Sequence, residues 1–202
     1  MDKDSLLKSI AETGYNVGFG AKKNFASYDI VDNVPGSIVF ISIAVGILSL
    51  VFDDLSTKLP SATLTIAGVA SLCVTHFVHR KDQYEQAGRD LTQLFNRLRD
   101  LYRSVQGGAE VSSAHAELLA IESQSYGLGV SKQVFGSDWY AHYKFFCQMQ
   151  HDWIDEQKRF TWRNKFPFSL RASVVILIVV ALAWGGFGAW EHFDLESYFP
   201  LK

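Results

Sequence analysis

Apolar residues are concentrated in three stretches, residues 36–52, 61–78 and 172–190, none of which contains Asp, Glu, Lys or Arg. At about 1.5 Å per residue, helices over the first two would be about 26 Å and 27 Å long, close to the roughly 30 Å apolar core of a bilayer. We predict that all three cross a membrane and that the first two form a hairpin closed by the polar turn 53–60. The alternative is a buried hairpin of a soluble protein.

Basic residues flank one end of each predicted span. Lys22 and Lys23 precede the first span, Arg80 and Lys81 follow the second, and Arg171 directly precedes the third. Cytoplasmic flanks of spans are enriched in Lys and Arg. We therefore predict a cytoplasmic N-terminus, a long cytosolic segment between the second and third spans, and an external C-terminal tail over residues 191–202.

Small residues recur four positions apart, a spacing that lets neighbouring helix backbones approach closely. One pair lies in the N-terminal segment 1–35, whose apolar residues have helical spacing. The other two pairs lie in the first two spans. The predicted close-packing positions are Gly14 and Gly18, Ser42 and Gly46, and Ala67 and Ser71. Pro35 is expected to end the N-terminal helix before the membrane.

The second span runs into a segment, residues 79–106, with apolar residues at alternating spacings of three and four. These residues are Tyr84, Ala87, Leu91, Leu94, Leu98, Leu101 and Val105. Because no proline lies between Ala62 and Gln106, one continuous helix is expected. The heptads have two compatible interpretations. Leu91, Leu94, Leu98, Leu101 and Val105 form an oligomerisation face, or they pack against the N-terminal helix or the segment 131–166.

The segment 107–170 begins with a weak helix over 111–127 and continues with many aromatic residues. Several of these keep helical spacing over 135–160, including Phe135, Trp139, Tyr143 and Trp153. This pattern predicts an amphipathic helix that packs on the other helices or lies on lipid headgroups. A pocket for a planar ligand such as a nucleotide, formed by these four aromatic residues, is the alternative.

Composition limits the chemistry. A net charge of −2 over 202 residues gives little support to nucleic-acid binding through bulk charge. The two cysteines, Cys73 and Cys147, form no disulfide framework. The spacing of His142, Cys147, His151 and Asp152 matches no usual zinc pattern, and no hydrolase, metalloprotease or nucleotide-loop motif is present. We predict a protein that is not an enzyme and has no catalytic residue, cofactor or metal.

Two longer strings carry a resemblance to a known family. They are GYNVGFGAKKNFASYDIVDNVPG at 14–36 and YEQAGRDLTQLFNRLRDLY at 84–102. With the hairpin between them, residues 13–105 resemble the SLATT family, the SMODS and SLOG-associating two-transmembrane effector domains. The resemblance implies a membrane effector of bacterial conflict systems, placed beside nucleotide second-messenger synthases, nucleotide sensors or reverse transcriptases. The third span and the segment 107–168 depart from the two-span pattern, and that segment is a candidate sensor of the trigger.

The expected protein is therefore an all-α membrane protein of the bacterial inner membrane. Its parts are a cytosolic amphipathic helix at 1–35, a transmembrane hairpin at 36–78, a heptad helix at 79–106, further cytosolic helices at 107–170, a third span at 171–190 and the tail at 191–202. The resemblance implies an antiphage effector that oligomerises into a pore, or otherwise disrupts the membrane, and causes abortive infection. The alternative is a scaffold that recruits a cytosolic enzyme. Expected partners are the lipid bilayer, further copies of the chain, a defence protein encoded nearby, and a nucleotide or nucleic-acid trigger.

Overall fold

The computed structural model describes the backbone of residues 1–191 and the side chains of residues 1–182, and this part of the chain contains helices and no strand. The predicted tail after residue 191 lies outside the described residues. The α-helices are α1 (Lys3–Leu48), α2 (Lys58–Thr75), α3 (Lys81–Gln106), α4 (Val111–Ser125), α5 (Ser137–Gln148), α6 (Asp152–Lys158) and α7 (Phe168–Glu191). Short 3₁₀ turns cover Asp53–Ser56, Val78–Arg80 and Trp162–Lys165.

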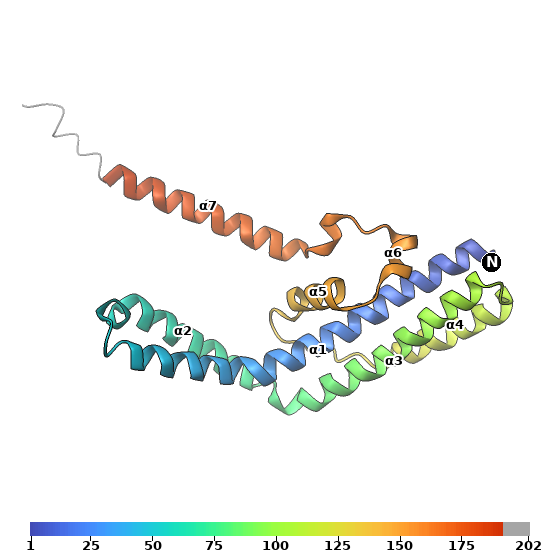
Figure 1. Ribbon diagram of the computed structural model, residues 1–202, viewed down its shortest axis with the longest axis horizontal. Coiled ribbons are helices and arrows are strands. Elements are labelled where there is room, and N and C mark those ends of the chain that lie inside the picture. The colour runs from blue at the N-terminus through green and yellow to red at the C-terminus, as the bar shows by residue number, and fades with distance from the viewer. Residues whose placement is uncertain (192–202) are drawn as a thin grey trace, which may run out of the picture.

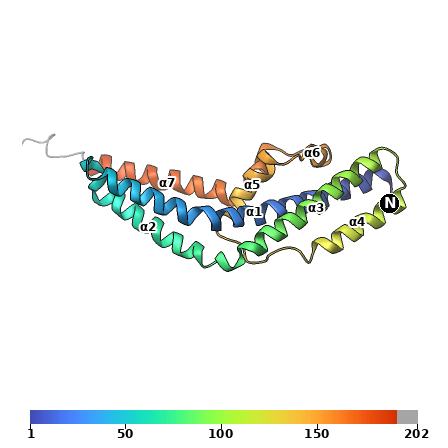
Figure 2. The same cartoon turned by 60° about the horizontal axis from the view of Figure 1, so that its bottom comes forward.

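The molecule is elongated and has two parts (Figures 1 and 2). The part of α1 before Pro35 packs with α3, α4, α5 and α6, and these helices are called the helical body below. The part of α1 after Pro35 and all of α2 form a hairpin that leaves the body. In both views α7 extends to the same side of the body as the hairpin. This arrangement fits a body beside a membrane with apolar helices directed into it.

Helix α1 is continuous through Pro35, so the expectation that Pro35 ends the N-terminal helix is wrong. Asp2 caps its first turn, because the Asp2 carboxylate accepts a hydrogen bond of 2.8 Å from the Ser5 N–H. Its 46 residues correspond to about 69 Å. The helix packs on α3 before Pro35 and on α2 after it, and membrane helices tolerate proline because neighbouring groups satisfy the freed backbone.

The predicted continuous helix over Ala62–Gln106 is interrupted between α2 and α3. The Phe77 N–H donates to the Val74 carbonyl at 2.9 Å and the Arg80 N–H to the Phe77 carbonyl at 2.9 Å, which tightens the backbone into a 3₁₀ turn. The chain changes direction there (Figure 1). Both α2 and α3 thereby keep contact with α1, which is the physical reason that we infer for a break without proline or glycine.

The heptad residues of α3 lie in the core of the helical body. Leu91, Leu94, Leu98, Leu101 and Val105 are at most 5% exposed, and they form one apolar cluster with residues of α1, α4, α5 and α6. Members of the cluster from the other helices are Leu6, Ile10, Ile121, Phe145 and Ile154. The local-packing interpretation of the heptads is therefore confirmed, and oligomerisation through this face stays a prediction.

Two glycines of α1 allow aromatic rings to approach the helix backbone. A Cβ added at Gly14 would lie 2.2 Å from the Trp153 ring, and one added at Gly18 would lie 2.7 Å from the Phe95 ring. The predicted close packing at these positions is thus present, with ring edges in place of a helix backbone. The glycines explain how Trp153 reaches a fully packed position at 6% exposure.

The hairpin is apolar and almost wholly exposed. The 18-residue apolar windows of the two helices long enough to cross a membrane are each only 6% buried. Gly46 has no neighbouring atom within 4 Å of a Cβ, Ser42 and Ala67 are half-buried, and Ser71 is buried. The predicted third span is helical in α7, with large apolar side chains exposed from Val174 to Leu182. Its insertion in a membrane stays a prediction.

The aromatic segment does not form one amphipathic helix, so that expectation is wrong. It is divided into α5 and α6, with extended backbone at Met149 and a hydrogen bond of 2.9 Å between His151 Nδ1 and the Met149 carbonyl. The division lets Phe145 of α5 and Trp153 of α6 both face α1. On a single straight helix these two residues, eight positions apart, would point about 80° away from each other.

Candidate functional site

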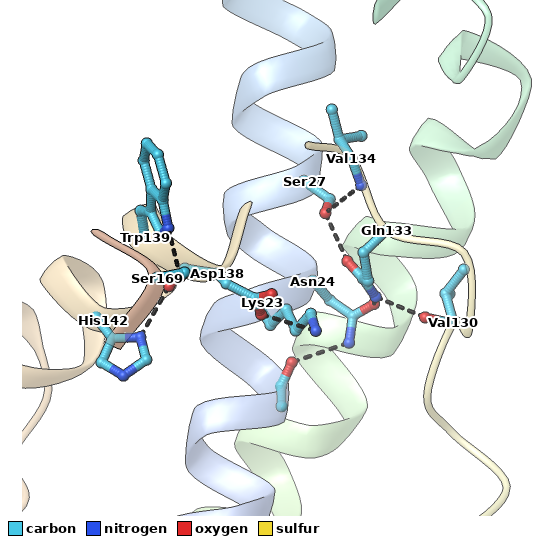
Figure 3. Close-up of polar contacts among 11 residues, drawn as sticks. Lys23, Asn24, Ser27, Val130, Gln133, Val134, Asp138, Trp139, His142 and Ser169 are labelled. Carbon is cyan, nitrogen blue, oxygen red and sulfur yellow. Dashed lines mark hydrogen bonds and ion pairs between the residues drawn. The ribbon is translucent and has the colours of Figure 1, made fainter. Parts of the chain in front are cut away.

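The candidate site is the level at which the hairpin and α7 leave the helical body, called the neck below. It combines the middle of α1, the first turn of α3, the linker 126–136 between α4 and α5, and the start of α7 (Figure 3). Segments far apart in the sequence meet here. Any signal that passes from the body to the membrane helices must cross this level.

A polar network fastens the linker to α1 (Figure 3). The Ser27 hydroxyl donates to Gln133 Oε1 at 2.5 Å and accepts a longer contact of 3.5 Å from the Val134 N–H. Gln133 Nε2 donates to Asn24 Oδ1 at 3.2 Å and to the Val130 carbonyl at 2.5 Å. Ser27 is fully buried and Asn24 is 2% exposed. Buried hydrogen bonds of this kind are costly to break, so they hold the linker in one position.

Tyr84 joins the linker to α3. Its hydroxyl donates to the Lys132 carbonyl at 2.5 Å, and its ring is fully buried with Val31 and Val134. Phe77 packs against the same apolar cluster at its margin. Burial raises the pKa of the Tyr84 hydroxyl above its ordinary value. The linker thus bridges α1, which continues into the hairpin, and α3, which follows the hairpin.

Ion pairs add charge to the neck. Lys81 contacts Asp32 at 2.5 Å, Lys144 pairs with Asp29, and Lys23 contacts Asp138 at 2.7 Å. The hydrogen bond to Asp32 raises the pKa of the Lys81 ammonium. These pairs tie α1 to the start of α3 and to α5, and their partly exposed positions make each of them modest in energy.

Two hollows adjoin the network. A groove of about 410 Å³ lies between α1, α3, the end of α4 and the linker, and Lys23, Asn24, Tyr126 and Gln133 are among its lining residues. On the membrane side, a cavity of about 520 Å³ is lined by residues that include Phe77, Phe135, Trp139 and Ser169. The amides of Asn24 and Gln133 are already used internally. A ligand in the groove would therefore compete with the bonds that hold the linker.

The four aromatic residues of the predicted ligand segment do not meet in one pocket. Trp153 is buried against Gly14, and Tyr143 lies on the outer surface, stacked on Tyr140 at 6.2 Å between ring centroids. Phe135 and Trp139 are neighbours, 6.0 Å apart, in the membrane-side cavity. A shared role in binding a planar ligand stays a prediction for that last pair alone.

Sequence reasoning missed the residues that organise the neck. Ser27, Asn24 and Gln133 belong to no recognised motif, and their contacts join positions 106 to 109 residues apart. One signal was available: Asn24 and Ser27 lie on a helix face that is otherwise apolar or small, with Ala21 and Val31 buried beside them. Polar residues on a buried face need partners, which predicts a network without identifying its other half.

Comparison with known proteins identifies the family of this chain. A family model described as SMODS and SLOG-associating 2TM effector domain 6 matches residues 1–174. The chain belongs to this family. The match agrees with the hairpin α1–α2 and with a membrane location, and the family is associated with defence systems. It also includes the segment 107–168, which therefore belongs to the family's domain and is not an addition to it.

No curated protein and no solved structure matches the chain significantly. The family match ends at residue 174, so most of α7 lies beyond it. The two-span description of the family applies to the hairpin, and α7 is a further apolar helix of this chain.

Proposed function

We propose that this protein is a triggered effector of bacterial antiphage defence that assembles through its membrane helices and makes the inner membrane permeable. The observation that carries the proposal is the exposed hairpin joined to a well-packed body. A single hairpin encloses no lumen, so permeation requires several copies. Loss of membrane potential would then stop growth of the infected cell and of the phage.

The surface of the hairpin supports assembly there. Gly36, Gly46 and Gly68 are small positions with open space beside them, and such positions favour close helix association in lipid. Hydroxyl groups of Thr63 and Thr65 donate to carbonyls of their own helix at 2.9 Å and 2.8 Å. These residues are therefore satisfied in lipid before assembly and are available to face water after it.

The test is membrane potential in bacteria that carry the chain with its native neighbouring genes, with and without phage. We expect depolarisation on infection, and we expect it to be lost in the double variant G46L/G68L because leucine prevents close helix approach. The matched control is G127L, which adds the same side chain at an open linker position and should keep the response. Depolarisation that persists in G46L/G68L would contradict assembly through these faces.

A scaffold that recruits a cytosolic enzyme is the competing function. It is favoured by large side chains on the outside of α4 and just beyond it, Leu119 at 51% and Tyr126 at 84% exposure. The same experiment separates the two functions. Protected cells with a steady potential would contradict the pore, and loss of protection in Leu119→Asp and Tyr126→Ala would then support recruitment.

A further inference from the structure

The segment 161–171, between α6 and the apolar part of α7, carries large aromatic side chains that nothing in the described part of the chain covers. Trp162 is 71% exposed, Phe166 41% and Phe168 78%. The rings of Trp162 and Phe166 lie 5.2 Å apart between centroids. Aromatic rings clustered in this way are typical of the boundary between membrane and water.

The same segment is strongly basic. It contains Arg163, Lys165 and Arg171, and no acidic residue occurs between Glu156 and Glu191. Within the described residues none of these three cations has a salt-bridge partner, in contrast to Lys23, which is paired with Asp138. Unpaired positive charge that alternates with aromatic rings is complementary to an anionic surface with an apolar layer beneath it.

Arg171 provides a more specific observation. Its guanidinium carbon lies 6.0 Å from the centroid of the Phe168 ring, and its Nε is buried without a hydrogen-bond partner among the described residues. Guanidinium N–H groups match phosphate oxygens in geometry and charge. Because the Nε is covered, a phosphate would meet this side chain through its terminal guanidinium N–H groups.

The segment lies at the level where the hairpin enters the membrane. Ser169 and Phe77, from the starts of α7 and of the α2–α3 turn, line the same cavity. Trp139 Nε1 donates to the Ser169 hydroxyl at 3.0 Å, which fixes α7 to α5 at this height (Figure 3). A bilayer that accommodates the hairpin therefore meets segment 161–171 at its headgroups.

We propose that segment 161–171 is a docking surface for anionic phospholipids of the leaflet that faces the helical body. Arg163, Lys165 and Arg171 bind headgroup phosphates, and Trp162 and Phe168 lie at the acyl-chain boundary. The occupant is lipid because the surface is continuous with the hairpin's membrane boundary and has matching charge. The proposal rests on the membrane location of the hairpin and is independent of pore formation.

The test measures lipid binding to the full chain in detergent by native mass spectrometry, with phosphatidylglycerol or phosphatidylcholine added. We expect the wild type to prefer phosphatidylglycerol. One basic residue near an anionic surface contributes about 1 kcal/mol, which is about fivefold in affinity. The triple variant R163Q/K165Q/R171Q should therefore bind phosphatidylglycerol about 100-fold more weakly and lose the preference.

Two variants make the result specific. R163K/K165R/R171K keeps the charges and should keep the preference. K8Q/R97Q/R103Q removes three exposed cations near the start of α1 and in the last part of α3, away from the neck, and should also keep it. The proposal is overturned if the wild type shows no preference for phosphatidylglycerol, in which case a protein partner is the better occupant. It is equally overturned if R163Q/K165Q/R171Q keeps the preference or K8Q/R97Q/R103Q loses it.

Discussion

At Gly14 and Gly18, the packing of the helical body requires a residue without a side chain. Their positions under Trp153 and Phe95 leave no room for a methyl group. Gly20 differs, because a Cβ there would meet Leu91 at 3.5 Å, an ordinary contact distance. The three glycines lie on one helix and have nearly the same local propensity, so they separate packing from backbone effects.

We predict that Gly14→Ala destabilises the body by about 1–3 kcal/mol, because the Trp153 ring is enclosed and cannot move away cheaply. Gly20→Ala is expected to be neutral or to stabilise by up to about 1 kcal/mol, because alanine is the better helix former. Thermal unfolding of the full chain in detergent, followed by circular dichroism, measures both. A lower midpoint for Gly20→Ala than for Gly14→Ala would contradict the packing argument.

At the scale of elements, the linker 126–136 connects three helices, α1, α3 and α5. It touches α1 through Ser27, α3 through Tyr84 and the start of α5 through the Ser137 N–H, which donates to the Val134 carbonyl at 3.1 Å. One side chain of the linker, Gln133, makes two of its three hydrogen bonds to α1. A change there loosens the linker without touching the apolar core.

Gln133→Ala is expected to cost about 1–3 kcal/mol locally, because it removes the acceptor of the buried Ser27 O–H and the donor to Asn24 Oδ1. Faster hydrogen exchange in residues 126–136, with unchanged exchange in the core of α3, is the expected measurement. Gln124→Ala removes an exposed amide that only accepts from Arg97 and serves as control. Equal exchange in the two variants would show that the network does not hold the linker.

The sequence predicted some elements well and others poorly for identifiable reasons. Charge-free apolar runs predicted the hairpin helices, and a few apolar residues in a small, polar segment predicted α4 as a weak helix. Heptad spacing predicted the buried face of α3, because burial imposes that spacing directly. The Pro35 expectation failed because packing on α2 and α3 outweighs the local preference of proline. α2, α3, α5 and α6 all pack on α1. The chain breaks between α2 and α3, and between α5 and α6, so that each helix can reach α1. Such a tertiary requirement leaves no signal in the local sequence. The neck network joins positions too distant for motif analysis.

At the scale of the whole molecule, the surfaces differ in whether other residues already cover them. The heptad face is occupied within the body, and the hairpin faces and segment 161–171 are open. A loss of function in a heptad variant is therefore ambiguous, since it would reflect unfolding before it reflected a missing oligomer. Assembly is better tested on the hairpin.

Leu98→Asp is predicted to unfold the helical body, because a carboxylate would replace a fully buried side chain without a cationic partner, at a cost of about 3–5 kcal/mol. Leu119→Asp, on the exposed face of α4, should leave the fold intact. Limited proteolysis of membranes that contain each variant distinguishes them, with rapid cleavage expected for Leu98→Asp alone. A protease-resistant Leu98→Asp chain that fails to cross-link with its copies would instead favour oligomerisation through the heptads.

Because α1 is uninterrupted, a rotation of the helical body is transmitted directly to the hairpin. One rod of about 69 Å has the part before Pro35, about 50 Å long, in the body and the part after it, about 20 Å long, in the hairpin, with the neck as the pivot. A tilt of about 5° about the neck moves the N-terminal end of the rod by about 4 Å and its hairpin end by about 2 Å in the opposite direction. A trigger that tilts the body would therefore rotate the hairpin through the same angle and alter how its faces meet those of neighbouring copies, without any helix unfolding.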